Sequence, residues 1–539
     1  MTRRTKKWLA GIGAAVAVML VAMLVTGYVL ARRVEPFIRE QVIAYLHERF
    51  DSEVEIAALR VRMRRASLVE TLLNRGHGLI ATVEGDGVQL RHKGRRDLPP
   101  MFAMKQFRFD VELRSLLDRT RVLHLVTVDG MEINVPPNGQ RPDLASGTGQ
   151  DVPSTQDAAA DTTSNVLLEE VIITNAALTI LPNNAKKFPL RFDIHRVRLE
   201  SAGQHVAMKY DAALTNAKPR GEVQSNGTLG PWVADEPGDS PLAGVYKFAN
   251  ADLGVFSGIG GTLESSGQFE GTLSSVNVKG EATVPNFRLK QVGNPVRLQT
   301  RFQVRVDGTS GDTILQPVNG SLGTTSFRTS GGIIRHESDL RRTISLNVSM
   351  PSGNIQDLLS LAMKGTPFMR GKIALNTKID IPPLTGSVRE KLLLDGQFQL
   401  SQARFLKSTV QDQIDTLSRR GRGQPGNADI SGVVSLMAGK FTLANEMITF
   451  QSLSFAVPGS GVDLTGTYDL DRDALDFHGT LRLQAKVSQT MTGWKRWVLK
   501  PIDPFFSKQG AGTLLRIQVV GTSKEPKFGR DRGKTTGTD

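Results

Sequence analysis

Apolar and polar side chains alternate with a period of two along most of the chain after about residue 166. The stretch 298–306 shows the pattern, which returns at 373–381, 394–400, 462–470 and 475–487. This period places successive side chains on opposite faces of a β-strand. The sequence therefore predicts strands with one apolar and one solvated face. Candidate residues on the apolar faces are Leu298, Phe302, Val304, Val306, Leu375, Ile379, Phe398, Leu400, Leu464, Leu481 and Leu483.

Residues 166–523 contain roughly sixteen to twenty strand candidates, and helices are expected only at 354–364, 409–419 and 489–508. Open sheets rarely exceed ~10 strands without curling or splitting, and single cores stop growing near ~250–300 residues. Two mainly β architectures fit. In tandem β-sandwiches or a closed barrel the apolar faces pack together, whereas in one elongated, curled antiparallel sheet they line a groove. The alternation by itself favours the sandwich or barrel.

The segment from Trp8 to Leu30 contains no charged residue. At ~1.5 Å per residue it is long enough to cross a bilayer core of ~30 Å as a helix. More positive charge precedes the segment than follows it, which favours a cytoplasmic N-terminus and export of the rest. A cleaved signal peptide is the alternative, but its apolar core is usually only ~7–15 residues long. We expect a retained single-pass anchor.

Composition shifts suggest five parts. Residues 1–33 form a cytoplasmic stub and the anchor, and 34–137 form an N-terminal module that begins with an amphipathic helix at 34–50. Residues 138–165, rich in small and polar residues, are expected to be a flexible loop. Residues 166–523 form the long β domain, and 524–539 form a polar, basic tail.

The chain has a net charge of +14 and no cysteine. The missing cysteines exclude disulfides and thiol chemistry. A basic balance suits anionic membrane surfaces as well as nucleic acid. Because the basic residues form no recognisable nucleic-acid-binding motif, we expect no nucleic-acid partner.

No catalytic or metal site emerges. The eight histidines are scattered without metal-ligand spacing. The GxGxxG at 421–426 follows a predicted helix instead of a strand, which argues against a dinucleotide site. Asp469, Asp471 and Asp473 lack the glycine and glutamate that an EF-hand loop then requires, so they are interpreted as a polar hairpin tip. The sequence predicts a protein that is not an enzyme and has no cofactor or bound metal.

The segment 492–506 combines aromatic and basic residues. Such a mixture is typical of a membrane interface, where rings lie at headgroup depth and charged ends reach water. A cap that closes the end of the sheet, with the aromatic rings packed inside, is an equally good interpretation. The candidate interface residues are Trp494, Lys495, Arg496, Trp497, Phe505 and Phe506.

Short motifs in the C-terminal third, in this order, resemble the bacterial AsmA-like family. They are IQDLLSLAMKG at 355–365, IPP at 381–383, LDGQF at 394–398, FAVPG at 455–459, GTYDL at 466–470 and TGWK at 492–495. The N-terminal region also fits the family, with one expected membrane helix followed by VEPF at 34–37 and FDSEV at 50–54. The resemblance covers the anchor, 34–137 and most of 166–529, and is weakest across 178–266.

This resemblance implies a periplasmic protein anchored in the inner membrane of a diderm bacterium. The family is related to bridge-like lipid transfer proteins, which begin with a chorein-type module and carry phospholipid along a curved β-sheet groove. It therefore favours the open groove over the sandwich. The expected activity is non-enzymatic binding and transfer of phospholipid toward the outer membrane, which would contribute to cell-envelope homeostasis. The expected partners are phospholipid and the inner membrane, with proteins of the outer membrane or envelope beyond them. The alternative is a non-enzymatic periplasmic scaffold that regulates outer-membrane protein assembly.

Overall fold

The computed structural model describes fifteen segments of the chain, and all structural statements below concern them. They are 52–63, 80–92, 96–112, 120–135, 165–181, 189–202, 207–231, 233, 236–290, 293–308, 310–335, 342–383, 388–490, 513–523 and 525–531. The predicted anchor at 8–30, the amphipathic helix at 34–50, most of the loop at 138–165 and the aromatic segment at 492–506 lie outside the described residues.

The described chain is mainly β, and its 24 strands belong to one sheet that does not close on itself. Of the strands, nineteen lie between Asn165 and Gly521, within the predicted number. The sandwich or barrel favoured by the alternation alone is wrong. A period of two determines which side chains share a face, but it does not determine what covers that face.

The chain forms two compact units, which we describe separately. Unit 1 comprises the described residues within Met1–Asp252, Leu263–Gly280 and Arg305–Gly311, and unit 2 comprises those of Leu253–Thr262, Glu281–Val304 and Asp312–Asp539. The predicted domain boundaries remain predictions.

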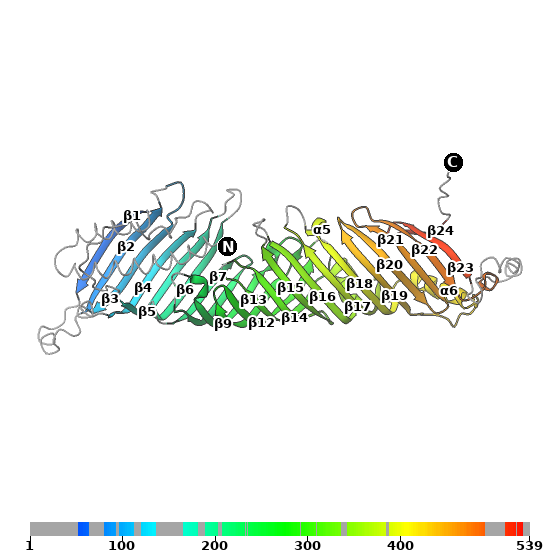
Figure 1. Ribbon diagram of the computed structural model, residues 1–539, viewed down its shortest axis with the longest axis horizontal. Coiled ribbons are helices and arrows are strands. Elements are labelled where there is room, and N and C mark those ends of the chain that lie inside the picture. Colours follow the sequence, from blue (N-terminus) through cyan, green and yellow to red (C-terminus); the bar gives the residue numbers. More distant parts are fainter. Residues whose placement is uncertain are drawn as a thin grey trace, which may run out of the picture. The chain divides into compact units, whose positions relative to one another are not determined.

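Unit 1 begins with strands that pair in sequence order (Figure 1). Its strands are β1 (Ser52–Met63), β2 (Ile80–His92), β3 (Phe102–Glu112), β4 (Thr120–Val135), β5 (Asn165–Ile180), β6 (Leu190–Ala202), β7 (Met208–Ala217), β8 (Arg220–Leu229), β9 (Pro241–Asp252) and β11 (Thr262–Thr272). From β1 to β9 all pairs are antiparallel except β4 with β5, which run parallel. This corrects the expectation of a purely antiparallel sheet. Parallel neighbours need a long connection, and residues 136–164 provide it.

The register of unit 1 places large apolar side chains opposite one another on one face. Val83 pairs with Phe109, and Phe109 pairs with Val126. All three are 0% exposed. Gly85 lies under the ring of Phe107, where a side chain of any size would collide with that ring. The core of unit 1 therefore lies on the apolar face of β2 to β4.

Strands β14 to β23 of unit 2 lie side by side in sequence order, and all their neighbouring pairs are antiparallel (Figure 1). Further strands that belong to unit 2, wholly or in part, are β10 (Ile259–Gly260), β12 (Ser275–Leu289), β13 (Val296–Val306) and β24 (Pro526–Arg530). The others are β14 (Thr313–Leu322), β15 (Thr325–Arg335), β16 (Arg342–Asn354), β17 (Met369–Ile381), β18 (Leu393–Phe405), β19 (Ser435–Ala444), β20 (Met447–Val457), β21 (Ser460–Asp469), β22 (Ala474–Leu483) and β23 (Thr513–Gly521).

The two longer helices of unit 2 lie at one end of its strands. Helix α4 (Ile355–Ala362) joins β16 to β17, and α6 (Ser408–Gly421) follows β18. Both confirm the helices predicted at 354–364 and 409–419. The short helices are α5 (Val388–Lys391), η2 (Pro237–Asp239), η3 (Leu253–Val255) and η4 (Val487–Thr490). We call the strand ends at Asn354, Met369, Phe405, Ser435, Val457 and Leu483 the helix end.

Candidate functional site

The most extensive chemical feature of unit 2 is its apolar face, which the strand register builds row by row. Four rows of side chains cross β16 to β23, and none of them contains a charged residue. One row consists of Met350, Leu375, Phe398, Gly439, Leu453, Leu464, Gly479 and Ile517. The next, toward the helix end, continues with Ile373, Leu400, Met437, Phe455, Val462, Leu481 and Leu515.

Four phenylalanines form a continuous ladder across this face. The ring centroids of Phe398 and Phe441 are 6.2 Å apart, those of Phe441 and Phe450 are 6.3 Å apart, and those of Phe450 and Phe477 are 5.6 Å apart. All three pairs are tilted, an arrangement that aromatic quadrupoles favour. Glycines on β19 and β21 leave space for two of these rings: Gly439 lies against Phe398, and Gly466 pairs with Phe477.

On β17 and β18, burial decreases away from the helix end. Ile373 is 6% exposed and Leu400 is 3% exposed, because α4 packs on them through Leu358 and Leu359. Leu375, two residues further along β17, is only half-buried. Most other side chains of the four rows are also half-buried, although Phe477 and Val519 are buried. Much of the apolar face therefore leaves the outer ends of its side chains uncovered.

The apolar face is large. Eight strands at ~4.8 Å spacing and four rows at ~6.8 Å spacing span about 34 Å by 20 Å, or roughly 700 Å² of sheet. Part of this area is covered, since Ile373 and Leu400 lie under α4. The half-buried remainder is a contiguous apolar surface, and such surfaces mark binding sites for apolar ligands or partners.

Hydrogen bonds hold the helix end together. The carboxylate of Asp415, on α6, accepts from the backbone N–H groups of Gly432 and Val433 and from Gln411, at 2.8, 2.8 and 2.9 Å respectively. Burial by itself raises the pKa of Asp415, but these hydrogen bonds outweigh it and lower the pKa. Asp415 therefore stays ionised and fixes the chain after α6 onto the helix.

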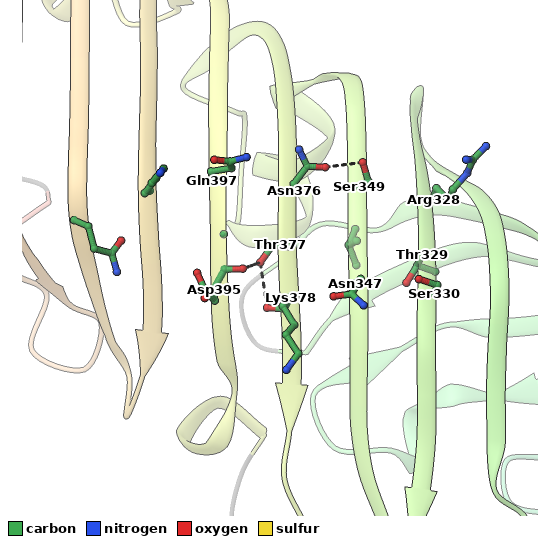
Figure 2. A pocket seen from close by; sticks show the side chains of 14 residues that line it. Arg328, Thr329, Ser330, Asn347, Ser349, Asn376, Thr377, Lys378, Asp395 and Gln397 are labelled. Carbon is green, nitrogen blue, oxygen red and sulfur yellow. Dashed lines mark hydrogen bonds between the residues drawn. The ribbon is translucent and has the colours of Figure 1, made fainter.

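The opposite face of unit 2 is polar and contains a shallow concavity of about 600 Å³. Figure 2 shows two levels of polar side chains from neighbouring strands, with Gln397, Asn376 and Ser349 at one level. The Ser349 hydroxyl donates to the Asn376 amide oxygen at 2.6 Å. The lining residues include three cations, one carboxylate and no aromatic ring. This composition is typical of a solvated sheet face.

On the apolar face of unit 1, two tyrosines satisfy their hydroxyl groups locally. Tyr210 lies 3.0 Å from the Ser225 hydroxyl, and Tyr246 lies 3.1 Å from that of Ser265. Burial raises the pKa of both tyrosines, and the hydrogen bonds to serine oppose this only in part. The two phenols therefore stay neutral, and this face carries no charge at these positions.

The structure places the sequence-predicted residues as follows. On β13, Leu298, Phe302, Val304 and Val306 are half-buried, and Arg297, Gln299, Arg301 and Arg305 are exposed. Leu375, Ile379, Phe398, Leu464 and Leu481 lie together on the open part of the apolar face of unit 2, whereas Leu400 lies under α4 and Leu483 is buried at the helix end. The interface candidates Trp494, Lys495, Arg496, Trp497, Phe505 and Phe506 lie outside the described residues.

Sequence reasoning missed three rungs of the phenylalanine ladder, Phe441, Phe450 and Phe477. The alternation did indicate these residues, since each occupies an apolar position in the period-two pattern of its strand. What the sequence lacked was the register, because rings become neighbours only when their strands are paired. The glycines opposite the rings were the available clue.

The acidic and histidine side chains of the described residues form no metal site. No group of three histidine or acidic side chains within them could hold a metal ion. The Asp469–Asp473 segment is the tip of the β21–β22 hairpin, where Asp469 accepts from the N–H groups of Asp471 and Arg472, which confirms the interpretation from sequence. Within the described ranges, no helix has the length and apolar character needed to span a membrane.

Comparison with known proteins adds no identification. No protein-family model, no curated protein and no solved structure matches the chain. The functional argument therefore depends on the residues and on their arrangement.

Proposed function

We propose that this chain is an inner-membrane-anchored, periplasmic lipid-binding protein that transfers phospholipid toward the outer membrane. The observation that carries the proposal is the uncharged apolar face of β16 to β23, on which most side chains are only half-buried. The anchor, the periplasmic location and the direction of transfer follow from the N-terminal sequence and from the resemblance to the AsmA-like family.

The energetics favour such a surface. Moving a ~16-carbon acyl chain into water costs ~13 kcal/mol at ~0.8 kcal/mol per methylene, so free diffusion between membranes is negligible. On a face of leucine, isoleucine, valine and phenylalanine, the acyl chain makes apolar contacts equivalent to those that it loses on leaving the membrane. No fixed catalytic group is needed, because the lipid is moved and not changed.

The register also suggests how a lipid would lie. The rows run from strand to strand, so an acyl chain placed along one row meets apolar atoms continuously from Leu375 to Ile517. Polar and charged side chains begin one residue away along each strand, but they point to the other face. An acyl chain could therefore slide along a row without crossing a charged group.

Leu375 and Asn376 provide a matched test, because they are adjacent in β17 and lie on opposite faces. We expect Leu375→Asp to deplete co-purifying phospholipid and to slow transfer of a fluorescent phospholipid between vesicles by at least ~10-fold. Its carboxylate would have to be desolvated by the acyl chain, which costs several kcal/mol. Native mass spectrometry of the full chain and the transfer assay are the two measurements.

Asn376→Asp introduces the same charge on the polar face and should leave both lipid content and transfer unchanged. The pair Leu464→Asp and Thr465→Asp repeats the comparison on β21. Circular dichroism establishes that each variant is folded. The proposal fails if folded Leu375→Asp and Leu464→Asp retain wild-type lipid, or if the wild-type chain carries none.

A further inference from the structure

The polar face of unit 2 changes character at its helix end. Along most of its length the exposed positions are occupied by residues such as Asn376, Gln397 and Lys440, with single apolar residues such as Leu393 among them. Four large apolar side chains are exposed at or just beyond the helix end of β17 to β19: Phe368 is 44% exposed, Leu406 49%, Val434 46% and Leu436 54%. Single exposed apolar residues are ordinary, but adjacent ones indicate a contact surface.

The strand register brings these four residues together. The backbone N–H of Leu406 donates to the carbonyl oxygen of Phe368 at 2.8 Å, which places the two residues side by side. Ala403 pairs with Ser435, and both are buried on the apolar face. Val434 and Leu436, the neighbours of Ser435, therefore point to the polar face. We call Phe368, Leu406, Val434 and Leu436 the end patch.

Two arginines lie within the end patch, directly opposite each other. Arg370 of β17 pairs with Arg404 of β18, and both are exposed on the polar face. Like charges at directly opposed positions destabilise a sheet. Neither guanidinium has a carboxylate partner among the described residues. Arg404 donates through Nε to the carbonyl oxygen of Gly432 at 2.9 Å, which leaves its terminal nitrogens available.

The same chain offers a contrast. Several other arginines exposed on strands form ion pairs: the charged groups of Arg301 and Glu281 and of Arg198 and Glu170 are 2.7 and 2.6 Å apart. The Arg370–Arg404 couple lacks such a partner among the described residues and also places two cations directly opposite each other. It provides a local excess of positive charge that an external anion would neutralise.

From these observations we propose that the end patch docks on the surface of an anionic phospholipid bilayer. The two guanidinium groups match phosphate in geometry and charge. The surrounding phenylalanine, leucines and valine match the boundary between headgroups and acyl chains. A soluble anion would use the arginines but would leave the apolar side chains in water, so a lipid surface accounts for both halves of the end patch.

This site is separate from the apolar rows proposed to carry lipid, because Arg370, Arg404 and Leu436 lie on the other face of the strands and the remaining members lie beyond the strand ends. Lys407 adjoins Leu406 and is also exposed, which adds a third cation nearby. Docking here would hold the helix end of unit 2 against a membrane without occupying the apolar rows. The two proposals can therefore fail independently.

The test uses the full chain reconstituted in phosphatidylcholine nanodiscs, so that its N-terminal apolar segment is already inserted in a bilayer and does not itself bind the acceptor vesicles. Binding to acceptor vesicles is measured by flotation, with phosphatidylcholine alone or mixed with phosphatidylglycerol. We expect Arg370→Gln combined with Arg404→Gln to weaken binding to the phosphatidylglycerol vesicles by ~30-fold, because each cation near an anionic surface contributes about a factor of five. Leu406→Ser combined with Leu436→Ser should weaken binding to both kinds of vesicle.

The matched control is Lys440→Gln combined with Arg516→Gln, which removes two exposed cations from the same face outside the end patch. It should bind nearly as the wild type does. Equal losses in the control and the arginine variant would overturn the proposal, as would wild-type binding by the arginine variant. A wild-type preference for vesicles without phosphatidylglycerol would also overturn it. Native mass spectrometry of the same variants should show unchanged lipid content.

Discussion

At the scale of single residues, glycine decides where aromatic rings can lie on the apolar face. Gly466 has a φ of +156°, and a Cβ at this position would collide with the backbone carbonyl oxygen of Asp476 on β22. Phe477 pairs with Gly466, so its ring can extend over the neighbouring strand toward Phe450. The missing side chain is thus a requirement of both the backbone and the ring ladder.

This requirement predicts opposite results for two glycines of the same strand, β21. Gly466→Ala should lower the free energy of unfolding by ~2–3 kcal/mol, because the strand must move to relieve the collision. Gly461→Ala should be neutral or stabilise by up to ~1 kcal/mol, because no atom lies within 4 Å of the added Cβ. Denaturant unfolding monitored by circular dichroism checks both values, and equal effects would contradict the account.

At the scale of elements, β24 is a weakly secured strand of unit 2. It has only five residues and pairs only with β23 among the described strands. An additional tie comes from His478 on β22, whose Nδ1 lies 3.2 Å from the Asp531 carboxylate just after β24. His478 Nε2 also lies 3.1 Å from Asp476. The attachment of β24 therefore depends on the charge of one histidine.

The hydrogen bond with Asp531 raises the pKa of His478; burial lowers it, and Asp476 adds to the increase. A group whose pKa is raised by folding contributes its full stabilisation below the ordinary value of about 6.5. That contribution is lost as the pH rises through the higher folded value. We expect hydrogen-exchange protection of the β23–β24 pair to decrease as pH rises above neutral. His478→Gln should remove this dependence, and identical pH profiles for variant and wild type would contradict the prediction.

At the scale of the molecule, we expect the proposed lipid to stabilise the fold as well. The open part of the apolar face, including Phe398 and Leu464, is half-buried by the protein itself. A ligand that binds only the folded state stabilises it by ~2.7 kcal/mol at about 100 times its dissociation constant. Occupancy should therefore be visible in the stability of the whole chain.

We expect the full chain stripped of lipid to unfold several degrees lower than the chain as purified, and to bind a hydrophobic dye. Added phospholipid should restore the higher transition, because it covers the apolar rows again. Leu375→Asp should respond less to added lipid, and Asn376→Asp should respond as the wild type does. Differential scanning fluorimetry measures the transition. An identical transition with and without lipid would contradict a structural role for the ligand.

Much of the local structure could be read from the sequence. The alternation placed Phe302 and Leu375 on apolar faces and their neighbours Arg301 and Asn376 on polar faces. The helices at 355–362 and 408–421 were also predictable. These features are local, because backbone geometry alone determines which face of a strand a side chain occupies.

Only the tertiary structure decided what the alternation could not. The parallel pairing of β4 with β5, the neighbours of each ring in the phenylalanine ladder and the opposition of Arg370 and Arg404 all depend on register between strands far apart in sequence. Whether Leu400 is covered and Leu375 is open depends on where α4 packs. The sequence by itself determined that the strands have an apolar face. Long-range pairing determined that part of this face stays open, because burial depends on which distant segments come to lie over it.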